Sequence, residues 1–118
     1  MSRRYLLFLN DMEAACQRVC EFVQGCDQET FCSHGIAYYA IVRNLEIIGE
    51  AAKGIPDEVR QRHPQVEWAR IGRARDIIAH HYFALEDETL WEMTTVHVPR
   101  LLERLAPIIA TERAAVEG

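Results

Sequence analysis

Apolar side chains recur at intervals of three and four residues from Tyr5 to Val23. This spacing places them on one face of an α-helix and predicts an amphipathic helix of about five turns. Gln24 and Gly25 follow, and glycine is the residue that most often lies just past a helix end. The apolar stripe consists of Tyr5, Phe8, Leu9, Met12, Cys16, Val19, Cys20 and Val23.

The middle of the chain predicts a polar connection and two further helices. The connection covers residues 26–33, and Ser33 is a suitable N-cap for a second long helix that ends at about Lys53. A short helix is predicted from Pro56 to about Arg62. Proline suits the first position of a helix, and the two acidic residues that follow it suit the first turn.

The last third of the chain predicts two more long helices. One runs from about Glu67 to His80 or the residue after it. The other is capped by Asp87 and runs to about Arg113, beyond which the tail is expected to fray. Pro99 lies inside the apolar pattern of this last helix. It is expected to kink the helix or to remove one of its hydrogen bonds.

No segment alternates with a period of two residues, and the sequence contains no internal repeat. The pattern therefore predicts an all-α protein in which four main helices pack as a bundle, with one short extra helix. At 118 residues the chain is expected to form one domain that spans residues 1–118. An apolar content of 49% can build a core without disulfide bonds.

The formal net charge of −5 argues against a general nucleic-acid coating protein, which would usually be basic. It leaves room for a nuclease that acts at a small basic site. The apolar run near the N-terminus stops at Asn10, too early for a signal peptide. No stretch approaches the roughly 20 apolar residues needed to span a bilayer. The sequence thus predicts a cytoplasmic protein without a membrane span.

Four cysteines lie in the first third of the chain. The spacings between them match no common zinc pattern, and the first two fall on the apolar stripe, where a thiol packs as a small hydrophobe. We therefore expect free thiols, with no metal site and no cofactor. The four are Cys16, Cys20, Cys26 and Cys32.

The segment 75–82, Arg-Asp-Ile-Ile-Ala-His-His-Tyr, carries the candidate chemistry. Arg75 is a permanent cation whose planar donors suit phosphate oxygens, and His80 can move a proton near neutral pH. Together they supply what RNA cleavage without a metal requires: a group that takes the 2′-hydroxyl proton and a group that stabilises charge on the phosphoryl oxygens. The alternative is an exposed surface cation and a histidine that only packs.

The spacing Arg75-x4-His80-x-Tyr82 resembles the R-x4-H-x-Y signature of HEPN-domain ribonucleases, specifically the HepT-like toxins. The resemblance extends from about Tyr5 to Ile109. One difference is Asp76, where many members carry asparagine. Further segments resemble the family in the same order: Asn44 to Ala52 its "IIGEA" helix, Ile55-Pro56 and Val66-Glu67-Trp68 the connection after it, and Leu90-Trp91 and Val98-Pro99-Arg100-Leu101 its last helix.

The resemblance implies an antiparallel helical bundle and the toxin of a toxin–antitoxin pair. It implies a metal-independent endoribonuclease in which Arg75 and His80 are catalytic. It also implies a two-fold homodimer whose paired motifs meet in a cleft. The partner in such pairs is a small nucleotidyltransferase antitoxin that adds AMP to the tyrosine at the position of Tyr82. A rival hypothesis is a non-catalytic helical partner that binds and positions the nucleotidyltransferase.

The residues around the motif leave alternatives open. Arg75 and His80 are five apart and therefore differ by roughly 140° around a regular helix. Either the helix ends near His80, or the site combines residues from two protomers. Asp76 is four residues from His80, and we expect it to orient the imidazole as a supporting residue, although it can instead pair with Arg75. Tyr82 can pack at the dimer interface or face the cleft.

Arg70 and Arg73 lie just upstream of the motif and three residues apart. They are candidate RNA-binding residues that extend a track for the phosphate backbone. Arg60, Arg62 and His63 can join them from the preceding segment. The alternative is a basic face that is only solvated.

Overall fold

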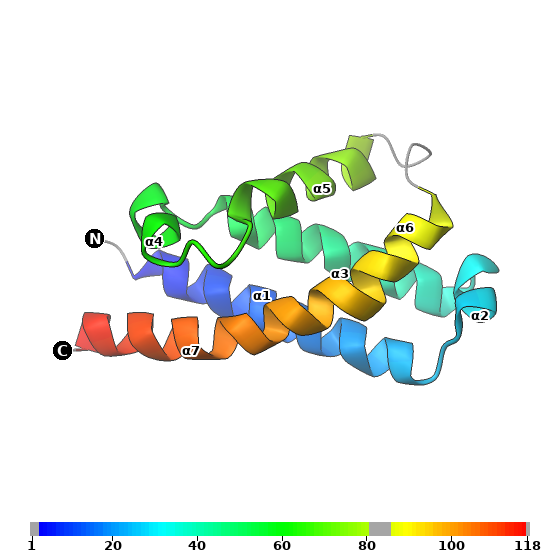
Figure 1. Ribbon diagram of the computed structural model, residues 1–118, viewed down its shortest axis with the longest axis horizontal. Coiled ribbons are helices and arrows are strands. Elements are labelled where there is room, and N and C mark those ends of the chain that lie inside the picture. Colours follow the sequence, from blue (N-terminus) through cyan, green and yellow to red (C-terminus); the bar gives the residue numbers. More distant parts are fainter. Residues whose placement is uncertain (1–2, 81–85, 118) are drawn as a thin grey trace.

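The computed structural model describes residues 3–80 and 86–117, and every regular element in these ranges is a helix (Figure 1). This confirms the all-α prediction. The elements are α1 (Arg4–Gln24), α2 (Gln28–Cys32), α3 (Ile36–Lys53), α4 (Asp57–Arg62), α5 (Trp68–His80), α6 (Asp87–Glu92), the π-helix η2 (Met93–His97) and α7 (Val98–Glu117). Tyr82 lies outside the described residues.

The long helices alternate in direction along the chain, and α6, η2 and α7 form one continuous final segment (Figure 1). Helix α1 lies between α3 and α7 and packs against both, whereas α5 packs mainly against α3. The core is therefore built chiefly from α1, α3 and α7. Helix α5, which carries the candidate motif, has one well-packed side.

The apolar stripes predicted from the sequence are the surfaces that become buried. Leu9, Met12 and Val19 of α1 are fully buried, as are Ile41 of α3 and Leu105 of α7. Each such side chain contributes about 1.5–3 kcal/mol by leaving water. In α5, by contrast, the buried residues are Trp68, Gly72 and Ile78.

A short helix, α2, occupies part of the segment predicted as a polar connection, so that prediction was wrong. Asp27 caps this helix, since its Oδ1 accepts a hydrogen bond of 2.8 Å from the backbone N–H of Thr30. Phe31 is fully buried, and the centroid of its ring lies 5.0 Å from that of the Tyr38 ring. Ser33, predicted as the N-cap of the second long helix, ends α2 instead and donates to the Thr30 carbonyl.

The final helical segment differs from the prediction at both ends. Glu86 is the N-cap position of α6, and the Asp87 carboxylate contacts His34 at 2.8 Å instead of capping. The helix continues to Glu117, so the fraying expected after Arg113 was wrong. The buried side chain of Glu112 holds this last part of α7 against the rest of the molecule.

The irregularity expected at Pro99 lies directly before it, as the π-helix η2. Proline has no N–H for the carbonyl four residues earlier, and π-turns are one way in which a helix absorbs a broken ladder. The hydroxyl of Thr94 donates to the Leu90 carbonyl at 2.8 Å, and that of Thr95 donates to the Trp91 carbonyl at 2.8 Å. These bonds go to carbonyls of α6, in the turn that precedes η2.

The four cysteines are free thiols in the structure. Cys16 is fully buried, and this burial raises the pKa of its thiol to about 12. Within residues 3–80 and 86–117, no helix combines the length and the apolar character that a membrane crossing requires.

Candidate active site on helices α3 and α5

Helix α5 carries the motif residues, and its position is set by close contact with α3. A Cβ atom added at Gly49 of α3 would overlap Cβ of Arg75, and it would lie 3.2 Å from the Ile71 carbonyl oxygen. Because Gly49 has no side chain, the two helices approach at this point more closely than other residues would allow. Arg75 thus leaves α5 directly over the backbone of α3.

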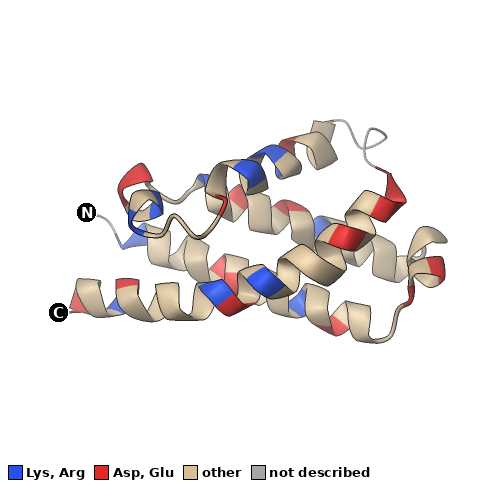
Figure 2. Cartoon of the chain, viewed as in Figure 1, with Lys and Arg blue, Asp and Glu red and all other residues tan. Residues whose placement is uncertain are grey.

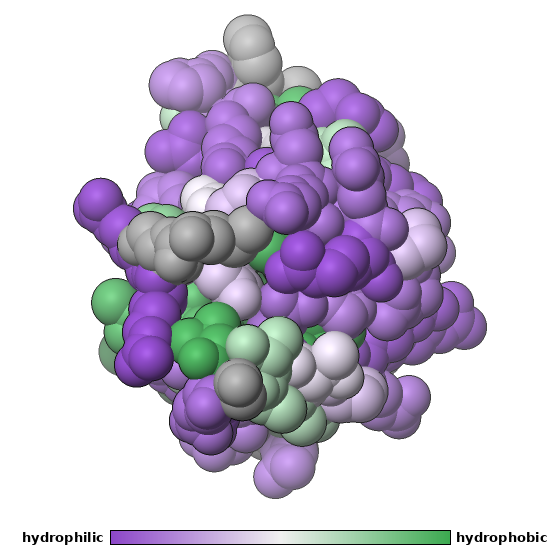
Figure 3. Space-filling view, turned by 90° about the vertical axis from the view of Figure 1, so that its left-hand side faces the viewer, coloured by the Kyte–Doolittle hydropathy of each residue, from purple (hydrophilic) through white to green (hydrophobic). Residues whose placement is uncertain are grey.

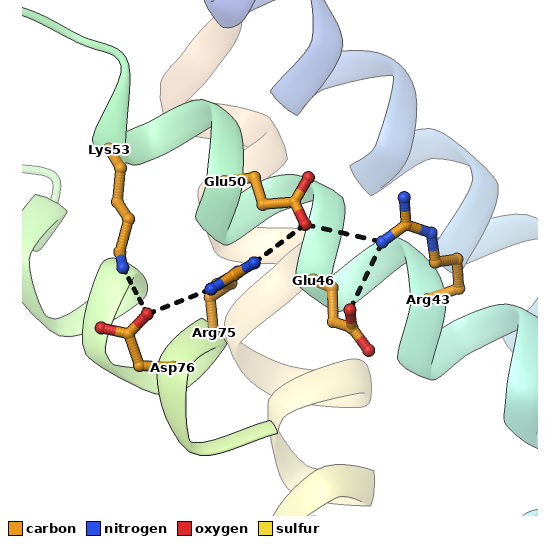
Figure 4. A network of polar contacts seen from close by, with 6 residues as sticks. All are labelled: Arg43, Glu46, Glu50, Lys53, Arg75 and Asp76. Carbon is orange, nitrogen blue, oxygen red and sulfur yellow. Dashed lines mark hydrogen bonds and ion pairs between the residues drawn. The ribbon is translucent and has the colours of Figure 1, made fainter. Parts of the chain in front are cut away.

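Two carboxylates contact the guanidinium of Arg75 (Figure 4). Nη2 donates to Oε1 of Glu50 at 3.3 Å, and Nη1 donates to Oδ1 of Asp76 at 3.4 Å. The bond to Glu50 is the main reason that the pKa of Arg75 is raised above its usual value. Nε of Arg75 is buried and has no hydrogen-bond partner in the described part of the chain. The guanidinium is therefore held from two sides.

Asp76 pairs chiefly with Lys53 of α3, whose ammonium group donates to Asp76 Oδ1. This hydrogen bond, followed by the one from Arg75, lowers the pKa of the Asp76 carboxyl. No hydrogen bond or ion pair joins Asp76 to His80 among the residues that the structure describes. The orienting role that we expected for Asp76 is therefore not seen in the described part of the chain, where Asp76 pairs with Lys53 and Arg75 instead.

The contacts continue along α3 to Arg43. Nη1 of Arg43 lies 3.3 Å from Oε2 of Glu46 and 3.6 Å from Oε1 of Glu50. Figure 4 shows the resulting row, in which cations and carboxylates alternate along side chains of α3 and α5. We call this set the α3–α5 charge network. It contains three cations and three carboxylates: Arg43, Glu46, Glu50, Lys53, Arg75 and Asp76.

His80 is the last residue of α5 and is exposed. The helix is continuous from Arg75 to His80, so their side chains leave it in directions about 140° apart. The structure therefore places Arg75 against α3 and His80 at the free end of α5. The described part of the chain does not bring them together.

Arg70 and Arg73, the predicted RNA-binding residues, are both exposed on α5. Arg70 pairs with Glu67 at 3.0 Å, and Arg73 has no ion pair within the described ranges. Both line an open hollow of about 480 Å³ whose floor includes Trp68. Figure 2 shows basic positions along α5, whereas α6 on the other side of residues 81–85 carries acidic ones.

The other basic residues proposed for the RNA track have structural partners. Arg60 donates to the carbonyls of Ala52, Lys53 and Ile55, which closes the C-terminal end of α3. Arg62 and His63 both contact Glu112 of α7. These three side chains are thus occupied. Of the basic residues proposed for the track and described by the structure, Arg73 has no ion pair, and Arg70 has only the exposed pair with Glu67.

A buried carboxylate that the sequence did not single out joins three helices. Glu112 is 1% exposed, and its oxygens lie 2.6 Å from Nη2 of Arg62, 2.6 Å from Nε2 of His63 and 3.1 Å from the Tyr5 hydroxyl. The hydrogen bonds from Arg62 are the largest of the effects that lower its pKa to about 2. Trp68 completes the cluster by donating its indole N–H to the His63 carbonyl at 2.9 Å.

This cluster fastens the start of α1 and the whole of α4 to the end of α7. Figure 3 shows that end of the molecule, whose surface is mostly hydrophilic with a smaller hydrophobic area. Within the described ranges, no group of three or more His, Cys, Asp or Glu residues is placed to hold a metal ion.

Comparison with known proteins connects this arrangement to a family. Residues 12–108 match the family model described as "Ribonuclease HepT-like". The chain belongs to this family. The match includes both helices of the candidate site, so the contact between Gly49 and Arg75 lies inside the HepT-like region.

Several curated relatives cover most of the chain. One is a "Putative RNase" of Caldanaerobacter subterraneus, which is 34% identical over 106 residues, or 90% of this chain and 95% of that protein. A "Probable ribonuclease HepT" of Thermococcus cleftensis is 34% identical over 86% of this chain and 92% of that protein. A "Putative RNase" of Methanocaldococcus jannaschii is 31% identical over 86% of this chain and 88% of that protein. No solved structure matches the chain with significance.

Proposed function

We propose that this HepT-like chain is an endoribonuclease that cleaves RNA through attack of a ribose 2′-hydroxyl on the adjacent phosphate. The 2′-oxygen forms a bond to phosphorus, the bond from phosphorus to the 5′-oxygen breaks, and the products carry a 2′,3′-cyclic phosphate and a 5′-hydroxyl. The observation that carries the proposal is the placement of Arg75, a fixed cation on an accessible helix within a ribonuclease-family fold.

Each motif residue has a role in this reaction. The imidazole of His80 takes the proton of the 2′-hydroxyl, because it is the motif imidazole that the structure describes and it is exposed. The guanidinium of Arg75 donates to the phosphoryl oxygens, on which negative charge develops in the transition state. Water protonates the departing 5′-oxygen. Arg70 and Arg73 contact neighbouring phosphates.

We propose that the complete site forms between two protomers of a homodimer. Within one chain Arg75 and His80 diverge by about 140°. Helix α5 packs mainly on α3, so its remaining surface is free to meet a second copy. An isologous two-fold contact would bring both motifs to one interface, where Arg75 of one protomer and His80 of its partner can reach one phosphate.

The proposal includes regulation by a nucleotidyltransferase antitoxin that adds AMP to Tyr82. In the sequence this position follows His80, the last residue of α5, by two residues. An added phosphate would compete with RNA for the guanidinium of Arg75 and would place bulk at the interface. This makes the protein the toxin of a toxin–antitoxin pair in the cytoplasm.

A second candidate function is that of a non-catalytic partner of the nucleotidyltransferase. The α3–α5 charge network favours it, because the positive charge of Arg75 is offset by Glu50 and Asp76. A guanidinium that is already paired attracts phosphate less strongly. The two functions differ in whether Arg75 and His80 are needed for RNA cleavage.

The experiment that separates them is cleavage of labelled RNA in excess chelator. The endoribonuclease predicts that cleavage persists, leaves 2′,3′-cyclic ends, and falls at least a hundredfold in Arg75→Ala and in His80→Ala. Arg100→Ala on the exposed surface of α7 is the matched control and should cleave as the wild type does. Activity that requires added magnesium would contradict the metal-independent mechanism. Absence of cleavage by the folded wild type on every RNA tested would favour the non-catalytic function.

A further inference from the structure

Glu50 is the side chain that fixes Arg75 from the α3 side. It follows Gly49, the residue at which α3 and α5 are in contact. The side chain of Glu50 therefore leaves α3 next to the point where the helix is closest to Arg75. Its Oε1 accepts from Nη2 of Arg75 at 3.3 Å. The same oxygen lies 3.6 Å from Nη1 of Arg43. Glu50 is thus itself held between two arginines (Figure 4).

We propose that Glu50 is a positioning residue for RNA cleavage, which orients the guanidinium of Arg75 toward the scissile phosphate. The inference rests on the proposed ribonuclease function and deepens it. Glu50 does not touch the RNA. It acts through Arg75, whose long side chain would otherwise be distributed over many rotamers.

The geometry of the guanidinium explains why one carboxylate on α3 matters. The group has three nitrogens in a plane, and in this chain Nη2 faces Glu50, Nη1 faces Asp76, and Nε is buried. The bond to Glu50 therefore fixes the plane of the group relative to α3. Asp76 sits on the same helix as Arg75 and is drawn toward Lys53, so it constrains that plane less.

Arg43 limits the opposing effect, which is neutralisation of Arg75. A carboxylate that served Arg75 alone would offset its charge and weaken its attraction for phosphate. Glu50 shares its charge with Arg43, and Glu46 lies beside Arg43 at 3.3 Å. The row of alternating charges thus holds Glu50 in place. Because Glu50 also interacts with Arg43, it offsets only part of the positive charge of Arg75.

Positioning and neutralisation predict opposite results when Glu50 is replaced. If Glu50 positions Arg75, Glu50→Ala lowers kcat by about tenfold to a hundredfold, because misplacing a catalytic group by about 1 Å has effects of this size. KM changes less than twofold. If Glu50 chiefly neutralises Arg75, its removal strengthens phosphate binding, and kcat/KM rises.

The experiment measures kcat and KM for wild type, Glu50→Ala, Glu50→Gln and Glu103→Ala as purified, full-length proteins on one labelled RNA. Glu103→Ala is the control, since Glu103 is exposed on α7 and lies outside the α3–α5 charge network. Its kinetics should match the wild type. Glu50→Gln keeps an acceptor oxygen but loses the charge-assisted bond, so its kcat should fall to a value between those of the wild type and Glu50→Ala.

Arg75→Ala separates the failure of this inference from the failure of the proposed function. If Arg75→Ala cleaves RNA as the wild type does, both are overturned. If Arg75→Ala is inactive while the folded Glu50 variants keep or exceed the wild-type kcat, the positioning role is overturned and the ribonuclease function stands. Circular dichroism reports folding, and Glu50→Gln decides the sign of the effect if Glu50→Ala does not fold.

Discussion

Gly49 and Arg75 touch through backbone and Cβ where α3 crosses α5, and no other amino acid fits at position 49 without moving one of the two helices. The smallest side chain there would overlap Arg75 Cβ. The position of the candidate catalytic arginine is therefore set by a residue that has no side chain.

Gly49→Ala should separate α3 from α5 and displace Arg75. Forcing a methyl group into this contact is expected to lower the free energy of unfolding by about 1–3 kcal/mol, as overpacking does elsewhere. Cleavage activity should fall with it. Urea denaturation and RNA cleavage measure the two effects. Gly25→Ala is the control, because a Cβ there meets nothing within 4 Å, and it should change neither quantity. An unchanged Gly49→Ala protein would show that the two helices do not meet as described.

Glu112 should make stability depend on acid pH. Its folded-state pKa of about 2 lies below its usual value of 4.5, mainly because of the hydrogen bonds from Arg62. A group whose pKa is lowered on folding contributes stability above its unfolded pKa. That contribution is lost as the pH falls toward the folded pKa. The wild type should therefore lose stability between about pH 5 and pH 2.

Glu112→Gln tests this contribution directly. At pH 7 the variant should be less stable by about 3 kcal/mol, because breaking a buried ion pair leaves Arg62 without its counter-charge. The difference from the wild type should shrink as the pH falls below 4.5, the usual value for this carboxyl. Denaturant titrations at several pH values give both results. Glu103→Gln, on the exposed side of α7, should show neither effect.

The proposed homodimer predicts twice the chain mass of 13.6 kDa at micromolar concentration. The physical reason is that α5 packs mainly on α3 and leaves a helix face for a second copy. Light scattering coupled to size exclusion measures the mass. A monomeric mass would exclude a site shared between protomers. An exposed apolar residue of α5, Ile77, offers a further test, since Ile77→Glu should weaken the dimer.

Tyr82→Phe should keep ribonuclease activity, because the phenol is given no role in the cleavage step. The variant should not gain mass when it is incubated with the nucleotidyltransferase and ATP, whereas the wild type should gain an adenylyl group. Intact-mass spectrometry reads the outcome. Equal mass gain in both proteins would place the modification elsewhere. Loss of cleavage in a folded Tyr82→Phe dimer would assign the phenol to the chemistry.

The long helices could be predicted from the sequence because each has an apolar stripe of several turns. Helix α2 could not, since five residues are too few to show a stripe. It forms because Asp27 caps it and because the buried ring of Phe31 packs against the rings of Tyr38 and Trp91 on other helices. The end of α7 is ordered for a similar reason, through contacts that Glu112 makes with residues far away in sequence.

The candidate site could be located from the spacing of Arg75 and His80, but its internal contacts could not. Whether Asp76 pairs with His80 or with Arg75 depends on which α3 residue lies next to it. The sequence alone does not give the register of α3 against α5. That register is set at Gly49, and it places Lys53 beside Asp76. Cross-helix partners such as these follow from packing, whereas positions along one helix follow from spacing.

Because α5 packs mainly on one side, most of the stability comes from the core of α1, α3 and α7, whereas the motif lies on the more weakly packed helix α5. Helix α5 has one principal neighbour, so the free energy needed to detach it is smaller than that needed to unfold the core formed by α1, α3 and α7. The backbone amides of α5 should therefore exchange with solvent before those of α1. Substitutions on its outer face therefore leave the core intact. Under the proposed function, substitutions at Arg70 and Arg73 should change phosphate binding while the scaffold beneath stays the same.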